Sequence, residues 1–317
     1  MTSFGACGLA VGHATDSEGA TGCTVLRGVD APFRCGAHVV GRATGTRELA
    51  LLHPGHLVDR VDAIFLSGGS AYGLDAAAGV MRWMEERGRG FAVGAGVVPI
   101  VPSAVIFDLA PLGRFDARPT AAMAYDACDR ATAGDVAEGS VGAGTGATVG
   151  KIAGPAQAMK GGCGVGSAQA GAIEVRALAV VNALGDVRDA AGAIVAGARD
   201  VNGRWIDSAR WIAQGDDGPP RFDALAGRST TLCIVSTNAA LDRVAVDVLA
   251  RAASAALYRR ITPVGTAFDG DIVFATAPVS GGVTATSARV EALAVIALEE
   301  AIERAVSPHA STGSPAR

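Results

Sequence analysis

The segment that decides the fold leads from a polar linker into an apolar strand, and it reads Ser229-Thr230-Thr231-Leu232-Cys233-Ile234-Val235-Ser236-Thr237. The preceding residues, 199–228, form a polar, loop-rich linker that includes Gln214-Gly215-Asp216-Asp217-Gly218-Pro219-Pro220. From Thr231 onward, apolar and β-branched residues follow one another without a charge, which is typical of a buried strand. Hydroxyl residues at such a junction usually mark only the place where a loop meets a strand. A chemical role for one of them needs support from the rest of the chain.

Strand and helix patterns alternate on both sides of this segment. Short apolar runs predict strands at 23–26, 37–40, 61–66, 104–109, 174–184 and 272–276. Helical patterns are found at 72–87, between Pro119 and Gly134, at 239–260 and at 288–306. In the third of these helices, one apolar stripe consists of Leu241, Val244, Val248, Ala252 and Ala255. The sequence therefore predicts an α/β chain, and a length of 317 residues allows one domain or two closely packed lobes.

Composition excludes several functional classes. Half of the residues are hydrophobic and 18% are charged, so the chain can bury a large core. The net charge is −4 and no basic block is present, which argues against nucleic-acid binding. The longest uncharged stretch, Phe91–Phe107, is too short for a membrane helix and contains Pro99 and Pro102. With no signal-peptide pattern at the N-terminus, we expect a soluble, cytoplasmic protein without a membrane partner.

The motifs of common cofactor and catalytic sites are incomplete. Gly142–Ala147 fits a loose dinucleotide pattern but lacks the downstream acidic residue, and Gly150-Lys151 is followed by Ile152 where a phosphate loop needs Ser or Thr. Ser70 misses the spacing of a nucleophile elbow by one residue. The six cysteines and five histidines show no zinc or disulfide spacing. These residues therefore give no support for a structural zinc, a dinucleotide site or a phosphate loop, and an enzyme of this sequence would need a base other than histidine.

An N-terminal threonine supplies its own base, because its free α-amine can accept the proton of its hydroxyl. An internal Thr230 acquires that amine only if the Ser229–Thr230 peptide bond is broken. In such a reaction the Thr230 hydroxyl attacks the Ser229 carbonyl, and water cleaves the resulting ester. The chemistry requires an oxyanion donor and groups that move protons.

Four polar residues in apolar surroundings are candidates for these tasks. Asp269 and Asp271 precede a strand, and residues two apart on an extended segment face the same way. Asn182 interrupts the apolar run 178–181, so its amide should be hydrogen-bonded and could donate to an oxyanion. Lys151 ends a glycine-rich stretch. Each has an ordinary alternative: turn aspartates, a strand-end asparagine and a solvated lysine.

The order and spacing of several motifs resemble one known family. The matching segments are Val11-Gly12-His13-Ala14, Gly45-Thr46-Arg47-Glu48, residues 66–77, Val98-Pro99-Ile100-Val101-Pro102, residues 142–151, Val181-Asn182-Ala183, Ser229-Thr230-Thr231-Leu232 and Phe268-Asp269-Gly270-Asp271. Together they are similar to the L-aminopeptidase/D-esterase family, which includes β-aminopeptidases and nylon-oligomer endohydrolases. The resemblance implies an α/β/β/α layered sandwich of the N-terminal-nucleophile-hydrolase type.

The resemblance also implies one self-processing domain, 1–317, cut into an α fragment, 1–229, and a β fragment, 230–317. These α/β pairs would assemble into a homo-oligomer, and the resemblance implies no metal and no organic cofactor. Thr230 would be the nucleophile, Asn182 and Lys151 would line its site, and Asp269 and Asp271 would form an acid pair. The substrates would be small molecules or short peptides bearing an α-, D- or β-amino acid at a free amino end.

Two positions depart from the family pattern. Ser229 stands where most members have Asn or Gly, and Phe107 stands where a tyrosine often donates to the oxyanion. The neighbouring Asp108 is a candidate to hold the substrate's ammonium group. Two other functions are compatible with the sequence: an acyltransferase resembling the ornithine acetyltransferases, and an uncleaved relative that serves as a binding protein.

Overall fold

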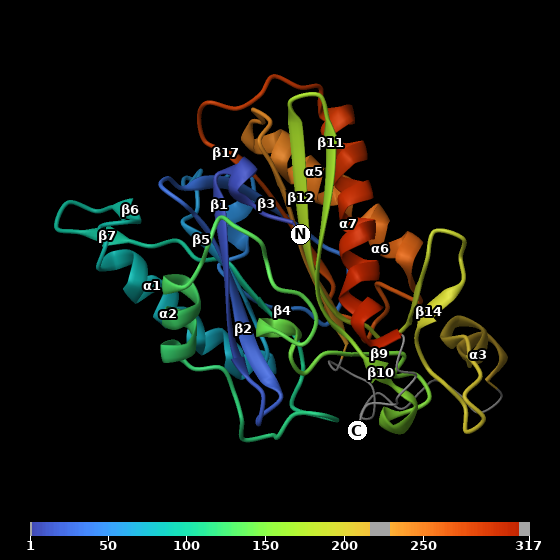
Figure 1. The fold of residues 1–317 in the computed structure, drawn as a ribbon. Coiled ribbons are helices and arrows are strands. Elements are labelled where there is room, and N and C mark those ends of the chain that lie inside the picture. The colour runs from blue at the N-terminus through green and yellow to red at the C-terminus, as the bar shows by residue number, and fades with distance from the viewer. Residues whose placement is uncertain (1, 216–228, 311–317) are drawn as a thin grey trace.

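Two five-stranded sheets lie face to face in the computed structural model, which describes residues 2–215 and 229–310 (Figure 1). The first sheet has the order β1 (Leu9–Asp16), β2 (Thr21–Gly28), β5 (Ala63–Ser67), β8 (Ser103–Val105) and β4 (Gly45–Arg47). The second has the order β11 (Gly162–Ala170), β12 (Ile173–Asn182), β15 (Thr230–Thr237), β17 (Ile272–Pro278) and β3 (Phe33–Val39). Residues from both sheets, including Leu26, Ile64, Leu178, Ile234 and Phe274, form the core between them.

Helices cover the outer face of each sheet. α1 (Ala77–Glu85) and α2 (Ala121–Asp129) pack on the first sheet through Val80, Met84 and Ala124. α5 (Arg243–Ala253), α6 (Ala255–Arg260) and α7 (Ser287–Ala310) pack on the second sheet. The layers therefore follow the order helix, sheet, sheet, helix, as the family resemblance predicts.

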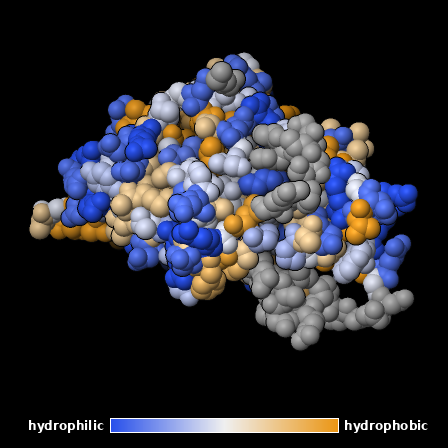
Figure 2. All heavy atoms as spheres, turned by 60° about the horizontal axis from the view of Figure 1, so that its bottom comes forward, coloured by the Kyte–Doolittle hydropathy of each residue, from blue (hydrophilic) through white to orange (hydrophobic). Residues whose placement is uncertain are grey.

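Short elements complete the described chain. Two strand pairs are β9 (Thr148–Val149) with β10 (Met159–Lys160) and β6 (Phe91–Ala92) with β7 (Val97–Val98). A small three-stranded sheet has the order β14 (Ile194–Ala196), β13 (Asp186–Arg188) and β16 (Ile261–Thr262). The remaining elements are the helix α3 (Ser208–Gln214) and 3-10 turns at 5–7, 50–52, 70–76, 142–144 and 155–157. The β6–β7 hairpin projects from the body (Figure 1), and an apolar patch lies at that side of the surface (Figure 2).

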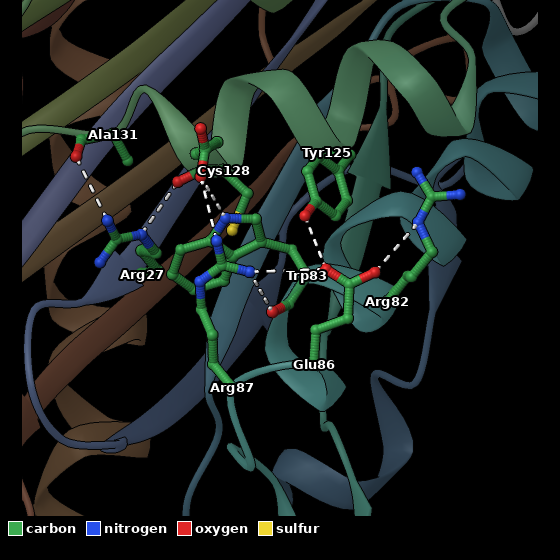
Figure 3. A network of polar contacts seen from close by, with 9 residues as sticks. Arg27, Arg82, Trp83, Glu86, Arg87, Tyr125, Cys128 and Ala131 are labelled. Carbon is green, nitrogen blue, oxygen red and sulfur yellow. Dashed lines mark hydrogen bonds and ion pairs between the residues drawn. The ribbon is translucent and has the colours of Figure 1, made fainter.

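The outer layer of the first sheet is fixed by arginines stacked on aromatic rings (Figure 3). The Arg87 guanidinium lies 4.0 Å from the centre of the Trp83 ring, and the Trp83 indole N–H donates to Asp129 at 2.9 Å. Tyr125 on α2 donates to Glu86, which follows α1, at 2.6 Å. These contacts join α1 to α2 on the side away from the sheet interface.

Glycines let α7 approach the second sheet closely. A Cβ added at Gly164 would lie 2.3 Å from the carbonyl oxygen of Ala301, and one added at Gly166 would lie 2.1 Å from that of Ala297. Real side chains do not tolerate such contacts, so the alternating glycines of β11 are required by the helix that covers them. Because these glycines hide the usual β pattern, β11 is a strand that sequence reasoning missed.

Four of the expected elements differ from the structure. The helix expected at 72–87 is α-helical only over 77–85 and is preceded by the 3-10 turn at 70–76. The helix expected at 239–260 begins at Arg243 and is divided at Ser254. Its predicted apolar stripe is wrong, because Val244 is 59% exposed and Val248 is 43% exposed. The buried positions are instead Val246, Leu249, Ala250 and Ala253. The strand expected at 104–109 ends at Val105, because the chain there turns towards the site. Of the linker predicted at 199–228, residues 208–214 form α3, and 216–228 lie outside the described residues.

Candidate active site

Thr230 is the first residue of β15, a strand in the middle of the second sheet. Its hydroxyl donates to the carbonyl oxygen of Ser229 at 2.6 Å. The backbone N–H of Gly270 donates to the same oxygen at 2.8 Å, because Ser229 is bridged in parallel to Asp269. Ser229 and Thr230 are both buried. The bond predicted to be cut therefore has a hydroxyl and an N–H donor on its carbonyl oxygen.

Asn182 lies directly opposite Thr230 in the antiparallel pairing of β12 with β15. Its side-chain oxygen accepts from the Thr148 N–H at 3.0 Å and from the Lys151 ammonium at 2.7 Å. Its side-chain nitrogen donates to the Phe107 carbonyl at 3.1 Å. The amide is thus held in one orientation by groups from two separate segments, residues 148–151 and Phe107.

Lys151 is a buried cation, not a solvated one. Its ammonium also donates to the backbone carbonyl of Asn182 at 2.8 Å. Burial lowers the pKa of Lys151 to about 7, and the Asp269 and Asp271 carboxylates offset part of that shift. At neutral pH this side chain can therefore exchange a proton, which an exposed lysine does poorly.

Asp269 and Asp271 are both 1% exposed and lie in the turn before β17. Asp271 accepts from the Thr231 N–H at 2.6 Å and from the Gly265 N–H at 3.1 Å. Burial, followed by the charge of Asp269, raises the pKa of Asp271 to about 7. Burial also raises the pKa of Asp269, while hydrogen bonds from Thr266 and the charge of Lys151 oppose that shift.

The structure brings these five residues into one polar cluster around the Ser229–Thr230 bond. Thr230 pairs with Asn182 across the sheet, and the Asn182 side chain accepts a hydrogen bond from Lys151. Asp271 accepts a hydrogen bond from the Thr231 N–H, and Asp269 forms a β-bridge with Ser229. The convergence expected from the sequence is therefore present in the geometry. The chemical role of each residue stays a prediction.

Phe107 contacts the polar cluster, whereas the neighbouring Asp108 is hydrogen-bonded to other residues. Phe107 touches the cluster through its backbone carbonyl. The Asp108 carboxylate accepts from the Thr21 hydroxyl at 2.6 Å and from the Gly69 N–H at 2.7 Å, and the residue is 1% exposed. Burial raises the pKa of Asp108 to about 6. An ammonium held by Asp108 would share this carboxylate with the Thr21 and Gly69 donors.

Several residues with direct contacts to the cluster were missed by sequence reasoning, among them Thr266 and Gly270. Thr266 donates to one Asp269 oxygen through both its hydroxyl, at 2.7 Å, and its backbone N–H, at 2.8 Å. Gly270 must lack a side chain, because an added Cβ would lie 2.6 Å from the Thr230 hydroxyl oxygen and 2.8 Å from the Ala43 carbonyl oxygen. Its only signal in the sequence was its position between the two aspartates.

Three further findings concern metal binding, membrane crossing and the cysteines. Among residues 2–215 and 229–310, no group of three or more His, Cys, Asp or Glu side chains is arranged to hold a metal ion. Within the same ranges, no helix combines the length and apolar character that crossing a membrane requires. The six cysteines are buried free thiols.

Comparison with known proteins identifies relatives across nearly the whole chain. An uncharacterized aminopeptidase of Mycobacterium tuberculosis is 43% identical over 285 residues, covering 85% of this chain and 79% of the relative. A 6-aminohexanoate-oligomer endohydrolase of an Agromyces species is 31% identical over 283 residues, covering 87% and 74%.

Solved structures share the fold. A β-aminopeptidase of a Burkholderia species superposes with a TM-score of 0.69 at 22% identity, covering 94% of this chain and 84% of that one. An L-aminopeptidase D-Ala-esterase/amidase of Ochrobactrum anthropi, described as a variant of the Ntn hydrolase fold, gives 0.68 at 21% identity with the same coverage. The predicted layered sandwich is thereby confirmed. The model of peptidase family S58 matches residues 6–313, and this chain therefore belongs to that family, as its motifs predict.

Proposed function

We propose that the chain cuts itself between Ser229 and Thr230, and that the mature protein is an aminopeptidase or amidase acting on short substrates with a free amino end. The observation that carries the proposal is the Ser229 carbonyl oxygen, which accepts both the Thr230 hydroxyl at 2.6 Å and the Gly270 N–H at 2.8 Å. A nucleophile and a donor for developing negative charge thus meet at one peptide bond. Family membership and the names of the relatives support amide hydrolysis.

In the first step, the Thr230 oxygen attacks the Ser229 carbonyl carbon. The α-amine of Thr230 is still part of the peptide bond, so another base must take the hydroxyl proton. Lys151 suits this task because its pKa of about 7 leaves much of it neutral at neutral pH. The Gly270 N–H stabilises the oxyanion, and the C–N bond breaks as a proton reaches the Thr230 nitrogen. Water then hydrolyses the ester to a Ser229 carboxylate and a free Thr230.

In the mature protein, the α-amine of Thr230 replaces Lys151 as the base for its own hydroxyl. Attack on a substrate amide gives an acyl ester on Thr230, which water hydrolyses. The Asn182 side-chain nitrogen, with backbone N–H groups, would stabilise the oxyanion. Asp271 would hold the start of β15 through the Thr231 N–H, 2.6 Å away. The reaction proceeds with hydroxyl, amine and carboxylate groups and needs no cofactor.

The topology explains how two fragments would remain one protein. β11, β12 and β3 belong to 1–229, whereas β15 and β17 belong to 230–317. In the second sheet, the two strands of the β fragment lie between strands of the α fragment. A cut before β15 would therefore leave the sheet ladder and both cores in place. We also propose, from the family resemblance, that these α/β pairs form a homo-oligomer.

Intact mass measurement and N-terminal sequencing of the purified protein test the cleavage. We expect one fragment that begins at Thr230, and an uncut but folded Thr230→Ala protein as the control. Finding only the original N-terminus would contradict self-cleavage, and a fragment that starts at Ser229 would move the nucleophile by one residue. Cleavage of the alanine variant at the same bond would exclude Thr230.

Release of p-nitroaniline from α- and β-amino-acid anilides tests the substrate class. We expect weak but measurable turnover of the free substrates and none of their N-acetylated forms. Equal turnover of both forms would indicate an endo-acting amidase that does not recognise the ammonium group.

A further inference from the structure

A separate cavity of 270 Å³ lies at the other end of the first sheet. Asp62 precedes β5, whereas the polar cluster contacts Phe107, which follows the parallel strand β8. The walls of the cavity include the apolar residues Pro32, Phe91, Ala92 and Ile100 and the charged residues Arg60 and Asp62. Ligand sites of this kind combine apolar walls with a few placed polar groups, and this volume is near their lower limit of about 300 Å³.

Asp62 is a buried carboxylate on the cavity wall. It is 4% exposed, and its side chain accepts one hydrogen bond, from the Ile100 N–H at 3.0 Å. Burial raises its pKa, with that bond and the charges of Arg89 and Arg60 acting in the opposite direction. Within the described ranges, no cationic side chain lies at ion-pair distance from it. A buried carboxylate without such a partner is costly, and a cationic ligand would compensate for it.

The two nearby arginines are engaged elsewhere. Arg89 donates to the carbonyls of Gly28 and Val29 at 2.9 and 3.1 Å. Arg60 forms an exposed ion pair with Asp59 at 3.1 Å, and such pairs contribute little, so its guanidinium can turn to another anion. The cavity therefore offers a carboxylate, a guanidinium and apolar wall residues.

We propose that this cavity binds a small aliphatic amino acid as its zwitterion, with the ammonium group against Asp62 and the carboxylate towards Arg60. Phe91 and Ile100 would contact the methylene groups between the two charges. Binding does not depend on the proposed function. If that function is correct, the ligand has the same chemistry as the released product.

Thermal unfolding of the full-length Thr230→Ala protein, which lacks the proposed nucleophile, tests the site with β-alanine as the probe. Propionate and propylamine are matched probes that each lack one charge. At a β-alanine concentration ten times its Kd, the melting temperature should rise by about 2–3 °C. Propionate should have no effect.

Asp62→Asn keeps an oxygen for the Ile100 N–H but removes the charge, so the β-alanine shift should disappear. Asp126→Asn, at an exposed carboxylate beside Arg130, is the control and should retain the shift. In the Arg60→Gln protein, propylamine should still raise the melting temperature. β-Alanine should raise it no more than propylamine does, because the partner of its carboxylate is gone. A shift of equal size in the Asp62→Asn protein would mean that β-alanine binds elsewhere, and no shift in any protein would also overturn the proposal.

Discussion

Gly270→Ala tests whether the geometry at the Ser229 carbonyl drives self-cleavage. The new methyl carbon would start 2.6 Å from the Thr230 hydroxyl oxygen and 2.8 Å from the Ala43 carbonyl oxygen, whereas ordinary contacts begin near 3.4 Å. Both contacts are therefore too short by more than half an ångström, and both must be relieved. The Ala43 backbone is tied down by its N–H bond to the Asp269 carbonyl at 2.9 Å, so relief requires a shift of the Gly270 backbone and a displacement of the Thr230 hydroxyl.

Misplacing a reacting group by about 1 Å costs about 100-fold in rate. We therefore expect the Gly270→Ala precursor to accumulate and to cleave about 100 times more slowly than the unaltered chain, which a time course of intact mass would measure. Gly55→Ala is the matched control, because the nearest atom to its added Cβ is 3.9 Å away. A folded Gly270→Ala protein that cleaves itself at the rate of the unaltered chain would refute the reasoning. Melting temperatures of both variants would separate slow chemistry from failure to fold.

Three more predictions concern the groups around Thr230. Self-cleavage should accelerate as the pH rises through about 7, where Lys151 loses its proton. Lys151→Arg, which stays charged, should block self-cleavage, and an unchanged rate between pH 6 and 8 would contradict a lysine base. Thr266→Val removes a 2.7 Å hydrogen bond to Asp269 and should slow anilide turnover about tenfold. Thr266→Ser keeps the hydroxyl and should restore the rate. Equal rates for the unaltered chain and both variants would show that this bond does not affect turnover. Phe107→Tyr should leave turnover unchanged or raise it, and a large loss would show that the ring is needed as it is.

The candidate site was more predictable than the packing around it. Asp269 and Asp271 were recognisable because two carboxylates two residues apart precede an apolar strand, and Asn182 because it interrupts one. Thr266 and Gly270 could not be found in this way. A threonine in a turn and a glycine between aspartates are common, and their importance arises only from distances across the fold.

The errors in secondary structure have a similar origin. Val244 and Val248 fit a helical stripe, but the sheet packs against the neighbouring face of α5, and burial is decided by that contact. The glycines of β11 lower strand propensity, yet the close approach of α7 requires them. In both places tertiary packing overrides the local pattern.

The position of β15 in the middle of the second sheet has a consequence for how the mature protein would unfold. Within a single protomer, an uncut chain unfolds in a unimolecular reaction, which adds no dependence of the melting temperature on protein concentration. Once the Ser229–Thr230 bond is broken, unfolding releases two separate chains, and mass action makes the stability rise with concentration. Because each fragment lacks strands that the other supplies, neither would have a complete second sheet alone. Self-cleavage would thus convert a folding equilibrium into an association equilibrium between two obligate halves.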